Sequence, residues 1–404
     1  MNIAFFCSDF NRSSIIAQPW KHIYEIARRM MALGNQVYVL TDEFRGLPKY
    51  EEIDGLPVCR IKKGRFLLNQ RNLLENLNKN NIDLINWHSG LMSAIYFWRL
   101  QKFIKNDVVW TVHTGKISCY DRGNLRFSDL KHLDKFWNNI LYSICPNSIF
   151  KRGANASPVK KIITSSKRLE TYFQNIGIPK KKITTISSGA DTNIFRPLSA
   201  LNIYDQKKKL GFHPQDPIII YFGPLCRLRG ADTVIFAMPK ILKEIPSAKL
   251  ILIARRTKSS FRNEESWFEK IAKRKGGTRL LTTISQKETL IKYLAIANVI
   301  VLPFRFWPFI ECPLTILEAM AMEKPVITTY AGSIPEIVSD GKTGILVQPG
   351  NPDMIAKATI KLLTDEDLSI NMGARAREYV KKSHDWDDIT RRTLNVFRKM
   401  DDDI

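Results

Sequence analysis

The sequence predicts an α/β protein in which two doubly wound parallel sheets form two separate domains. Short apolar runs alternate with amphipathic stretches along both halves of the 404-residue chain, as expected where strands alternate with helices. A chain of this length has ample core for two or three domains. No run of about 18 apolar residues is present, so we expect no membrane-spanning helix.

The first half contains six short runs with the composition of buried strands. The first helix is expected over 21–33, because Ile23, Ile26 and Met30 recur at helical spacing and Gly34 ends the pattern. In a parallel sheet of this kind, ligands bind beyond the carboxyl ends of the strands. The expected strands are 2–7, 36–41, 82–87, 108–113, 161–165 and 183–187.

Two histidines, His88 and His113, fall at the ends of expected strands. Under ordinary expectations, a single histidine in such a place is more often structural than functional. The local sequence alone leaves both interpretations open.

The most informative stretch runs from 299 to 350. It predicts a strand over 299–303, then a loop with Glu311, then a helix that begins at Leu314 after Pro313. The unpaired N–H groups of Leu314 and Thr315 would favour an anion such as a diphosphate. Glu318, one turn into the helix, could accept ribose hydroxyls, and Glu311 could hold sugar hydroxyls. The alternative is that both glutamates are ordinary surface charges.

Three linked segments in this stretch resemble the C-terminal domain of the retaining GT-B glycosyltransferases of the group 1 type. The segments are LEAMAMEKPVI (317–327), AGSIPEIV (331–338) and DGKTGILV (340–347), in the family's order and spacing. The resemblance implies two Rossmann-like domains that face a cleft, with the acceptor on the first and the donor on the second. It implies sugar transfer from a nucleoside diphosphate sugar without a metal ion or other cofactor.

The resemblance also assigns roles to individual residues. Thr111-Val112-His113 is similar to a family segment that contacts the donor sugar or acceptor, so His113 and Glu311 are the expected catalytic residues. The loop after the strand 217–222 is similar to the family's diphosphate clamp, with Arg229 in the place of its lysine. The donor is expected to contact Gly223, Arg227, Arg229, Pro313, Leu314, Thr315 and Glu318.

The chain departs from the family pattern at several places. Glu311 stands one residue later than the family's first glutamate, and Glu323 stands where glycine is usual. Pro224 replaces the arginine of the clamp, so Arg227 is expected to supply the second charge. Ala17-Gln18 stands where the family has a glycine pair, which removes the basis for a phosphate contact from that loop.

The domain boundary follows from a stretch over 187–195, which is similar to the segment that ends the first domain in the family. We therefore expect an N-terminal domain over 1–197, with 198–208 as a linker, and a nucleotide-sugar-binding domain over 198–384. The resemblance implies that the last helix, 385–404, packs back on the N-terminal domain.

The charge is strongly basic, at +23. Residues 1–200 hold 30 basic and 15 acidic residues, so +15 of the excess lies in the half that would bind the acceptor. Excess charge attracts polyanions, but no nucleic-acid-binding motif is present. We expect an acceptor such as a glycan or lipid-linked sugar, and contact with an anionic membrane surface. Arg60, Lys151 and Arg152 belong to basic clusters, and an apolar stripe over 130–141 is either core or an interfacial helix.

The six cysteines are scattered and include no C-x-x-C pair. This pattern indicates reduced thiols in a cytoplasmic protein and gives no support for structural zinc. Two other functions stay open. One is a sugar-nucleotide epimerase of the same fold, and the other is a non-catalytic protein that retains the nucleotide-sugar site.

Overall fold

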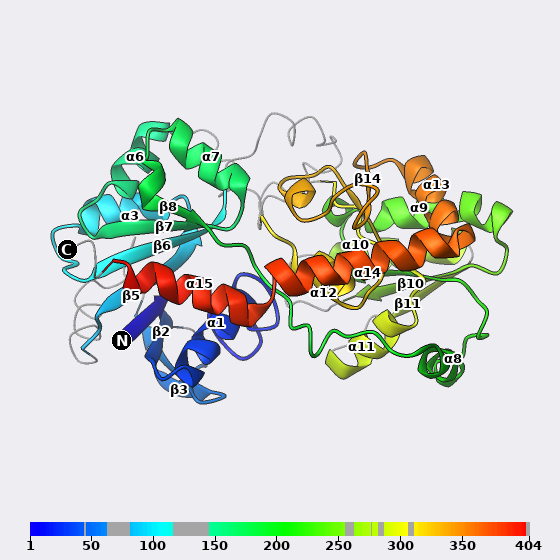
Figure 1. The fold of residues 1–404 in the computed structure, drawn as a ribbon, viewed down its shortest axis with the longest axis horizontal. Helices are drawn as coiled ribbons and strands as arrows, with labels where there is room; N and C mark the ends of the chain where they lie inside the picture. Colours follow the sequence, from blue (N-terminus) through cyan, green and yellow to red (C-terminus); the bar gives the residue numbers. More distant parts are fainter. Residues whose placement is uncertain are drawn as a thin grey trace.

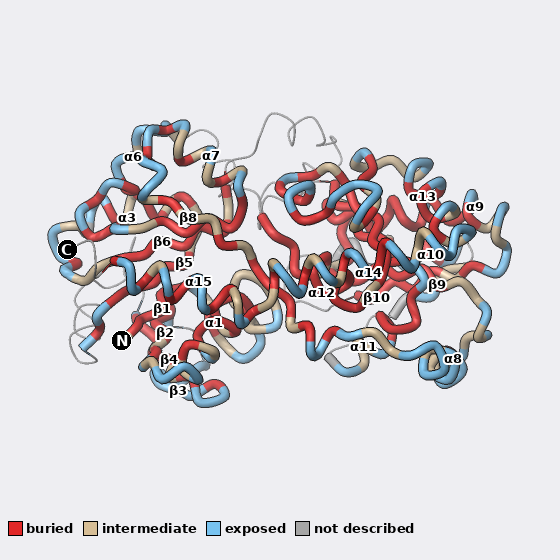
Figure 2. Tube along the Cα trace, viewed as in Figure 1, coloured by how far each residue is buried: buried red, intermediate tan, exposed pale blue. Residues whose placement is uncertain are grey.

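The structure is a computed structural model of the chain, and it describes residues 1–43, 46–62, 81–115, 145–254, 262–275, 277–281, 287–305 and 311–400. Two lobes lie side by side, each with its own sheet and surrounding helices (Figure 1). The strands are largely buried and the helices expose their outer surfaces (Figure 2). This architecture confirms the predicted fold class.

The described strands of the first lobe form one sheet in the order β3-β4-β2-β1-β5-β6-β7-β8. All neighbours are parallel except β3 and β4, which pair antiparallel at one edge. The strands are β1 (Asn2–Phe6), β2 (Gln36–Asp42), β3 (Tyr50–Ile53), β4 (Leu56–Ile61), β5 (Leu84–Gly90), β6 (Asp107–Thr114), β7 (Val159–Thr164) and β8 (Ile183–Thr185).

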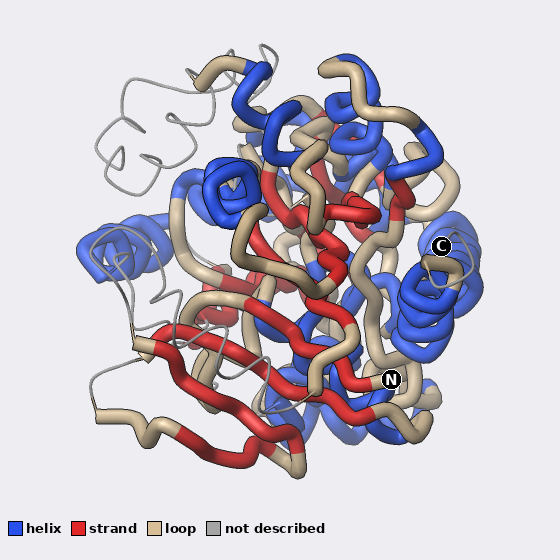
Figure 3. Tube along the Cα trace, turned by 90° about the vertical axis from the view of Figure 1, so that its left-hand side faces the viewer, coloured by secondary structure: helices blue, strands red, loops and turns tan. Residues whose placement is uncertain are grey.

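Alternate side chains of each strand enter cores on opposite faces of this sheet, as the period of two requires. On β1, Ala4 and Phe6 join the core under α3, α6 and α7, whereas Ile3 and Phe5 join the core under α1 and α15. Figure 3 shows the strands of this lobe with helices on either side. These helices are α1 (Trp20–Ala32), α3 (Ser93–Leu100), α6 (Asn147–Ala154), α7 (Lys167–Asn175) and α15 (Trp386–Arg398).

The second lobe has a parallel sheet in the order β11-β10-β9-β12-β13-β14. Its strands are β9 (Ile218–Gly223), β10 (Lys249–Ala254), β11 (Thr278–Leu281), β12 (Val299–Val301), β13 (Val326–Thr329) and β14 (Ile345–Val347). Its helices are α8 (Ala200–Lys209), α9 (Ala231–Glu244), α10 (Arg262–Lys275), α11 (Lys287–Ala295), α12 (Leu314–Ala321), α13 (Pro352–Thr364) and α14 (Glu366–Ser383). Its short 3-10 turns are η3 (Arg227–Arg229) and η4 (Ile334–Glu336), and a further one, η2 (Lys180–Lys182), precedes β8 in the first lobe.

The chain crosses between the lobes twice, once before α8 and once between α14 and α15 (Figure 1). At the second crossing, α15 packs on α1, and Arg29 Nε donates to Asp387 Oδ1 at 2.7 Å. The prediction that 198–208 is a linker needs correction, because most of this segment forms the helix α8. Ser199 caps this helix by accepting from Asn202 N, and the sequence ALNIYDQKKK contains no helix breaker.

The assignment of Arg60 to a basic surface cluster also needs correction. Its side chain is buried and paired with Glu51. The expected apolar stripe over 130–141 lies outside the described residues. Within the described part of the chain, no helix is long and apolar enough to cross a membrane.

Candidate functional site

The candidate donor site is built where β9 and β12 end and α12 begins. Pro313 precedes α12 in an extended conformation, and Leu314 and Thr315 are its first helical residues. Arg229 reaches this helix from η3, where its Nη2 donates to Thr315 Oγ1 at 2.9 Å. The geometry therefore joins the predicted clamp arginine to the predicted anion-binding helix terminus.

Gly223 has to be glycine because the Arg229 guanidinium lies against it. A Cβ at this position would stand 2.6 Å from Arg229 Nη1, and the backbone φ of +131° also disfavours a side chain. Phe304 supports the other side of Arg229, with its ring centre 4.8 Å from the guanidinium carbon. The guanidinium is thus held in place, and its residue is only 7% exposed.

Arg227 is not brought to the same point. Its guanidinium carbon lies 4.3 Å from the ring centre of Trp267 on α10. A buried ion pair, Arg305 to Asp232 at 2.5 Å, holds the neighbouring turn to the loop after β12. Arg305 N also donates to Leu228 O at 2.9 Å, so the clamp turn and that loop form one connected unit.

Glu318 lies on the second turn of α12 and is buried between the lobes. Its Oε1 accepts from Lys21 Nζ of α1 at 2.6 Å. Gln18, just before α1, also reaches α12, where its Oε1 accepts from Leu314 N at 3.4 Å and its Nε2 donates to Cys312 O at 2.8 Å. Polar groups of the first lobe therefore contact the predicted ribose and diphosphate positions.

Glu311 faces the first lobe. Ser166 Oγ donates to its Oε2 at 3.2 Å, and Arg168 lies 3.6 Å from its Oε1. Burial raises the pKa of Glu311, and Arg168 opposes that rise. The Glu311 backbone N–H donates to the carbonyl of His113 at 3.3 Å, so the two predicted catalytic residues lie together despite their separation in sequence.

His113 is one of three neighbouring buried histidines. Its Nε2 lies 2.9 Å from Nδ1 of His88, and its ring centre lies 5.1 Å from that of His22. Burial lowers the pKa of His113 to about 4. Burial, and then the neighbouring rings, hold the pKa values of His22 and His88 well below the ordinary value. All three rings are therefore neutral near pH 7.

Two family models match adjoining parts of the chain. Glycosyltransferase Family 4 matches residues 20–194, and Glycosyl transferases group 1 matches residues 202–379. Together the two models cover most of both lobes, and they match in the order in which the lobes follow one another along the chain. The chain belongs to the group 1 GT-B glycosyltransferases.

Proteins with similar sequences or structures support this family assignment. An uncharacterised glycosyltransferase of Methanocaldococcus jannaschii is 26% identical over 392 residues, which is 93% of each chain. A GDP-mannose-dependent phosphatidylinositol monomannoside mannosyltransferase of Mycobacterium tuberculosis is 27% identical over 62% of this chain and 64% of its own length. Sucrose-phosphate synthase of Thermosynechococcus elongatus shares the fold across 100% of both chains, with a TM-score of 0.79 at 20% identity.

Several residues of the glycosyltransferase site could not be found from the sequence. Lys21, His22 and Ser166 carry no local motif. Gln18, Lys21 and Ser166 reach the site only because the two lobes meet, whereas His22 packs on His113 within the first lobe. Arg168 follows Ser166 at the start of α7 and has no separate signal.

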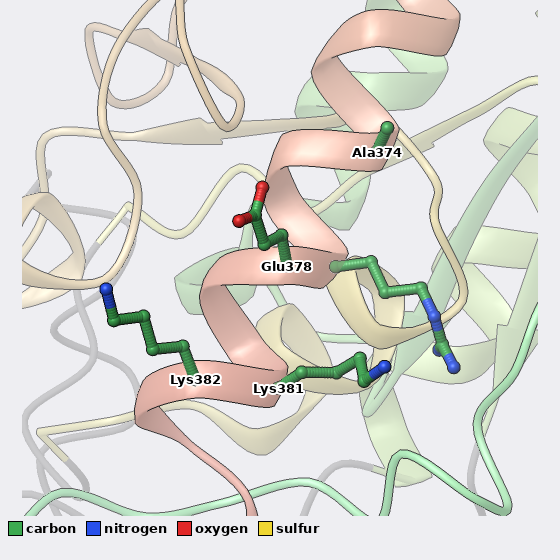
Figure 4. A pocket seen from close by; sticks show the side chains of 5 residues that line it. Ala374, Glu378, Lys381 and Lys382 are labelled. Atoms are coloured by element: carbon green, nitrogen blue, oxygen red, sulfur yellow. The ribbon is translucent and has the colours of Figure 1, made fainter.

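Among the described residues, no three or more histidine, cysteine, aspartate or glutamate side chains form a group that could hold a metal ion. A hollow of about 430 Å³ lies along α14, away from the candidate site residues. Its side chains, including Glu378, Lys381 and Lys382, project outward from that helix (Figure 4). It includes none of the predicted donor residues.

Proposed function

We propose that this glycosyltransferase moves a sugar from a UDP- or GDP-sugar to a glycan or lipid-linked acceptor, with retention of anomeric configuration. The observation that supports the donor assignment most directly is the cluster of Gly223, Arg229 and Thr315 at the start of α12, with Glu318 one turn further on. A fixed guanidinium and a helix N-terminus can together stabilise a diphosphate, before and after it leaves the sugar.

The proposed division of roles follows the positions of the two glutamates. Glu318 lies on the second turn of α12 and would accept the ribose hydroxyls, whereas Glu311 lies next to His113 and would hold the transferred sugar. Burial raises the pKa of Glu311, and its hydrogen bond from Ser166 and its contact with Arg168 favour the ionised form. An ionised Glu311 would accept hydrogen bonds from sugar hydroxyls.

The proposed reaction needs no metal ion, because Arg229 and the α12 terminus would neutralise the leaving diphosphate. The acceptor would attack from the face that the diphosphate leaves, and a diphosphate oxygen would take the acceptor proton. This front-face route rests on the family resemblance.

The acceptor side is proposed to contact an anionic membrane. Trp98 and Phe103 are 43% and 50% exposed beside α3, and Arg152 of α6 stacks on Trp98 at 5.7 Å. We call this the α3–α6 surface, made of Trp98, Arg99, Lys102, Phe103, Lys105, Lys151 and Arg152, all of which are exposed. Exposed aromatic rings among basic groups suit an anionic lipid surface. The lipid named for the mannosyltransferase relative supports this kind of acceptor.

A panel of UDP- and GDP-sugars tests the proposed function. A transferase should bind one of them and transfer its sugar slowly to water and rapidly to a suitable acceptor, with release of the nucleoside diphosphate in both cases. An epimerase would convert the nucleotide sugar into its epimer with no dependence on an acceptor. A non-catalytic protein would bind the donor and leave it intact, and that result would contradict the proposal.

A further inference from the structure

His88 lies directly behind His113 on the neighbouring strand. The two residues stand near the carboxyl ends of β5 and β6, with His88 Nδ1 and His113 Nε2 2.9 Å apart. Both side chains are buried, at 5% and 4% exposure. The contact is therefore a hydrogen bond between two imidazoles that are shielded from water.

Only one hydrogen can lie in this contact. Burial holds the pKa of both rings below the ordinary value, so each ring is neutral and has one N–H and one bare nitrogen. If His113 donates from Nε2, His88 must carry its own hydrogen on Nε2. If His88 donates from Nδ1, His113 must carry its hydrogen on Nδ1.

The surroundings of His88 distinguish these two arrangements. His88 Nε2 is sealed from solvent and has no hydrogen-bond partner among the described residues. A hydrogen there would be a buried donor without an acceptor, which costs about 1–3 kcal/mol. With a bare nitrogen in that place, the unpaired hydrogen lies instead on His113 Nδ1, which is not among the described side-chain atoms that are sealed from solvent without a partner, so a ligand or a water molecule can accept from it. The preferred arrangement has His88 donating from Nδ1 to His113.

We propose that His88 is a positioning residue that holds His113 in the Nδ1–H form, so that His113 presents a hydrogen-bond donor to the ligand. No described residue is a hydrogen-bond partner of His113 Nδ1, so this N–H is available for an oxygen acceptor. Suitable acceptors are a sugar hydroxyl, a carboxylate or a phosphate oxygen. The identity of the ligand rests on the proposed function, but the tautomer does not.

This arrangement removes His113 as a general base. Its Nε2 lone pair accepts from His88, and its Nδ1 carries a hydrogen, so neither nitrogen can take a proton from the acceptor hydroxyl. The acceptor proton has to go elsewhere, which agrees with transfer to a diphosphate oxygen. His22 packs edge-on against His113 at 5.1 Å, with its Nδ1 3.2 Å from Ser188 Oγ, and it keeps the His113 ring in place.

Long-range ¹H–¹⁵N NMR of the imidazoles in the ligand-free protein reads the tautomer without any need for activity. His384 provides an internal reference, because its Nδ1 lies 2.9 Å from the carbonyl of Ser188 and must carry a hydrogen to bond it. We expect His88 and His113 to show the same Nδ1–H pattern as His384. A solvent-exposed histidine side chain prefers the Nε2–H form, so the result is not expected by default. An Nε2–H pattern for His113 would overturn the proposal.

Two substitutions of similar size separate positioning from packing. His88→Asn places an amide N–H where Nδ1 stands, so His113 should keep its Nδ1–H form and kcat/KM should change less than about threefold. His88→Asp offers only an acceptor when ionised, so the His113 hydrogen should move to Nε2 and kcat/KM should fall by about tenfold or more, as expected for a lost hydrogen bond. Equal effects of the two variants, with the His113 tautomer unchanged in both, would contradict the proposed role. If neither variant binds or turns over a donor, the NMR result still decides the tautomer.

Discussion

Lys21 Nζ and Glu318 Oε1 lie 2.6 Å apart, although the two residues belong to different lobes and are separated by 297 positions in the sequence. Both side chains are buried, at 10% and 3% exposure. Breaking a buried pair leaves one charge without its partner, which is far more costly than losing a surface pair. This ion pair therefore favours the contact between the two lobes that the structure shows, which we call the closed arrangement.

Lys21→Met should shift the ligand-free protein toward a more open arrangement. The reason is that the closed arrangement would then bury Glu318 without a cation beside it, whereas an open one would hydrate it. Small-angle scattering should report a larger radius of gyration for this variant. Lys240→Met is the matched control, since Lys240 pairs with Asp353 on the surface of a single lobe. Identical radii for all three proteins would contradict the role of the pair.

Arg229→Ala should weaken the binding of UDP or GDP by about 1.5–3 kcal/mol, the usual worth of a charge-assisted hydrogen bond. Arg227→Ala should have a smaller effect, because that guanidinium lies on Trp267 and not at α12. Calorimetry with the bare nucleotides measures both. An Arg229→Ala variant with unchanged affinity would remove the proposed diphosphate clamp.

The two glutamates should respond differently to the length of the ligand. Glu318→Ala should weaken both the nucleoside diphosphate and the nucleotide sugar, because both contain ribose. Glu311→Ala should leave the bare nucleotide unaffected and reduce only the binding or turnover of the sugar-bearing donor. The same loss of nucleotide affinity in both variants would refute this assignment of roles.

The histidine cluster should make the folded state sensitive to acid. The pKa of His113 is about 4 when folded, against an ordinary value of about 6.5, so the unfolded chain binds protons over this interval and the folded protein does not. Stability is therefore complete above about pH 6.5 and decreases as the pH falls toward 4. Thermal unfolding across this range should show a shallower decrease for His113→Gln than for the native protein.

His213→Gln is the control for this experiment, because His213 is exposed on a turn far from the cluster in sequence. Its acid-induced decrease should match that of the native protein. The same slope in His113→Gln as in the control would show that His113 does not contribute.

The α3–α6 surface predicts salt-sensitive binding to anionic vesicles. The double variant Lys151→Glu, Arg152→Glu should bind much more weakly, since each basic group contributes about 1 kcal/mol near such a surface. Lys381→Glu, Lys382→Glu is the matched control on α14 of the other lobe (Figure 4). Co-sedimentation at low and high salt separates charge attraction from insertion of Trp98 and Phe103. Absence of binding at low salt would exclude the membrane proposal.

The secondary structure around Glu318 could be predicted from the sequence, because short-range patterns determine it. The turn and helix at Leu314 and the short strands that flank α12 follow from apolar runs and punctuating residues, and the structure places them there. The contacts of this helix could not be predicted. Gln18, Lys21 and Ser166 carry no motif of their own, and their approach depends on how two separately folded lobes meet.

Two other differences have equally plain physical reasons. The predicted linker contains α8, because its helix-favouring residues follow a serine that caps them. Arg60 was assigned to a surface cluster from its charge, but Glu51 on the neighbouring strand pairs with it in the interior. The proposed binding roles of the site residues stay predictions, since geometry alone does not identify a ligand.

We propose that the site transfers a sugar with retention of anomeric configuration and without a metal ion. The most direct measurement is ¹H NMR of the anomeric proton during turnover of an α-linked UDP- or GDP-sugar in the presence of a chelator. We predict that the first product formed is the α-anomer, that the nucleoside diphosphate is released in equal amount, and that Glu311→Ala abolishes the signal. A β-anomer as the first product, or turnover that stops when the chelator is added, would contradict the account.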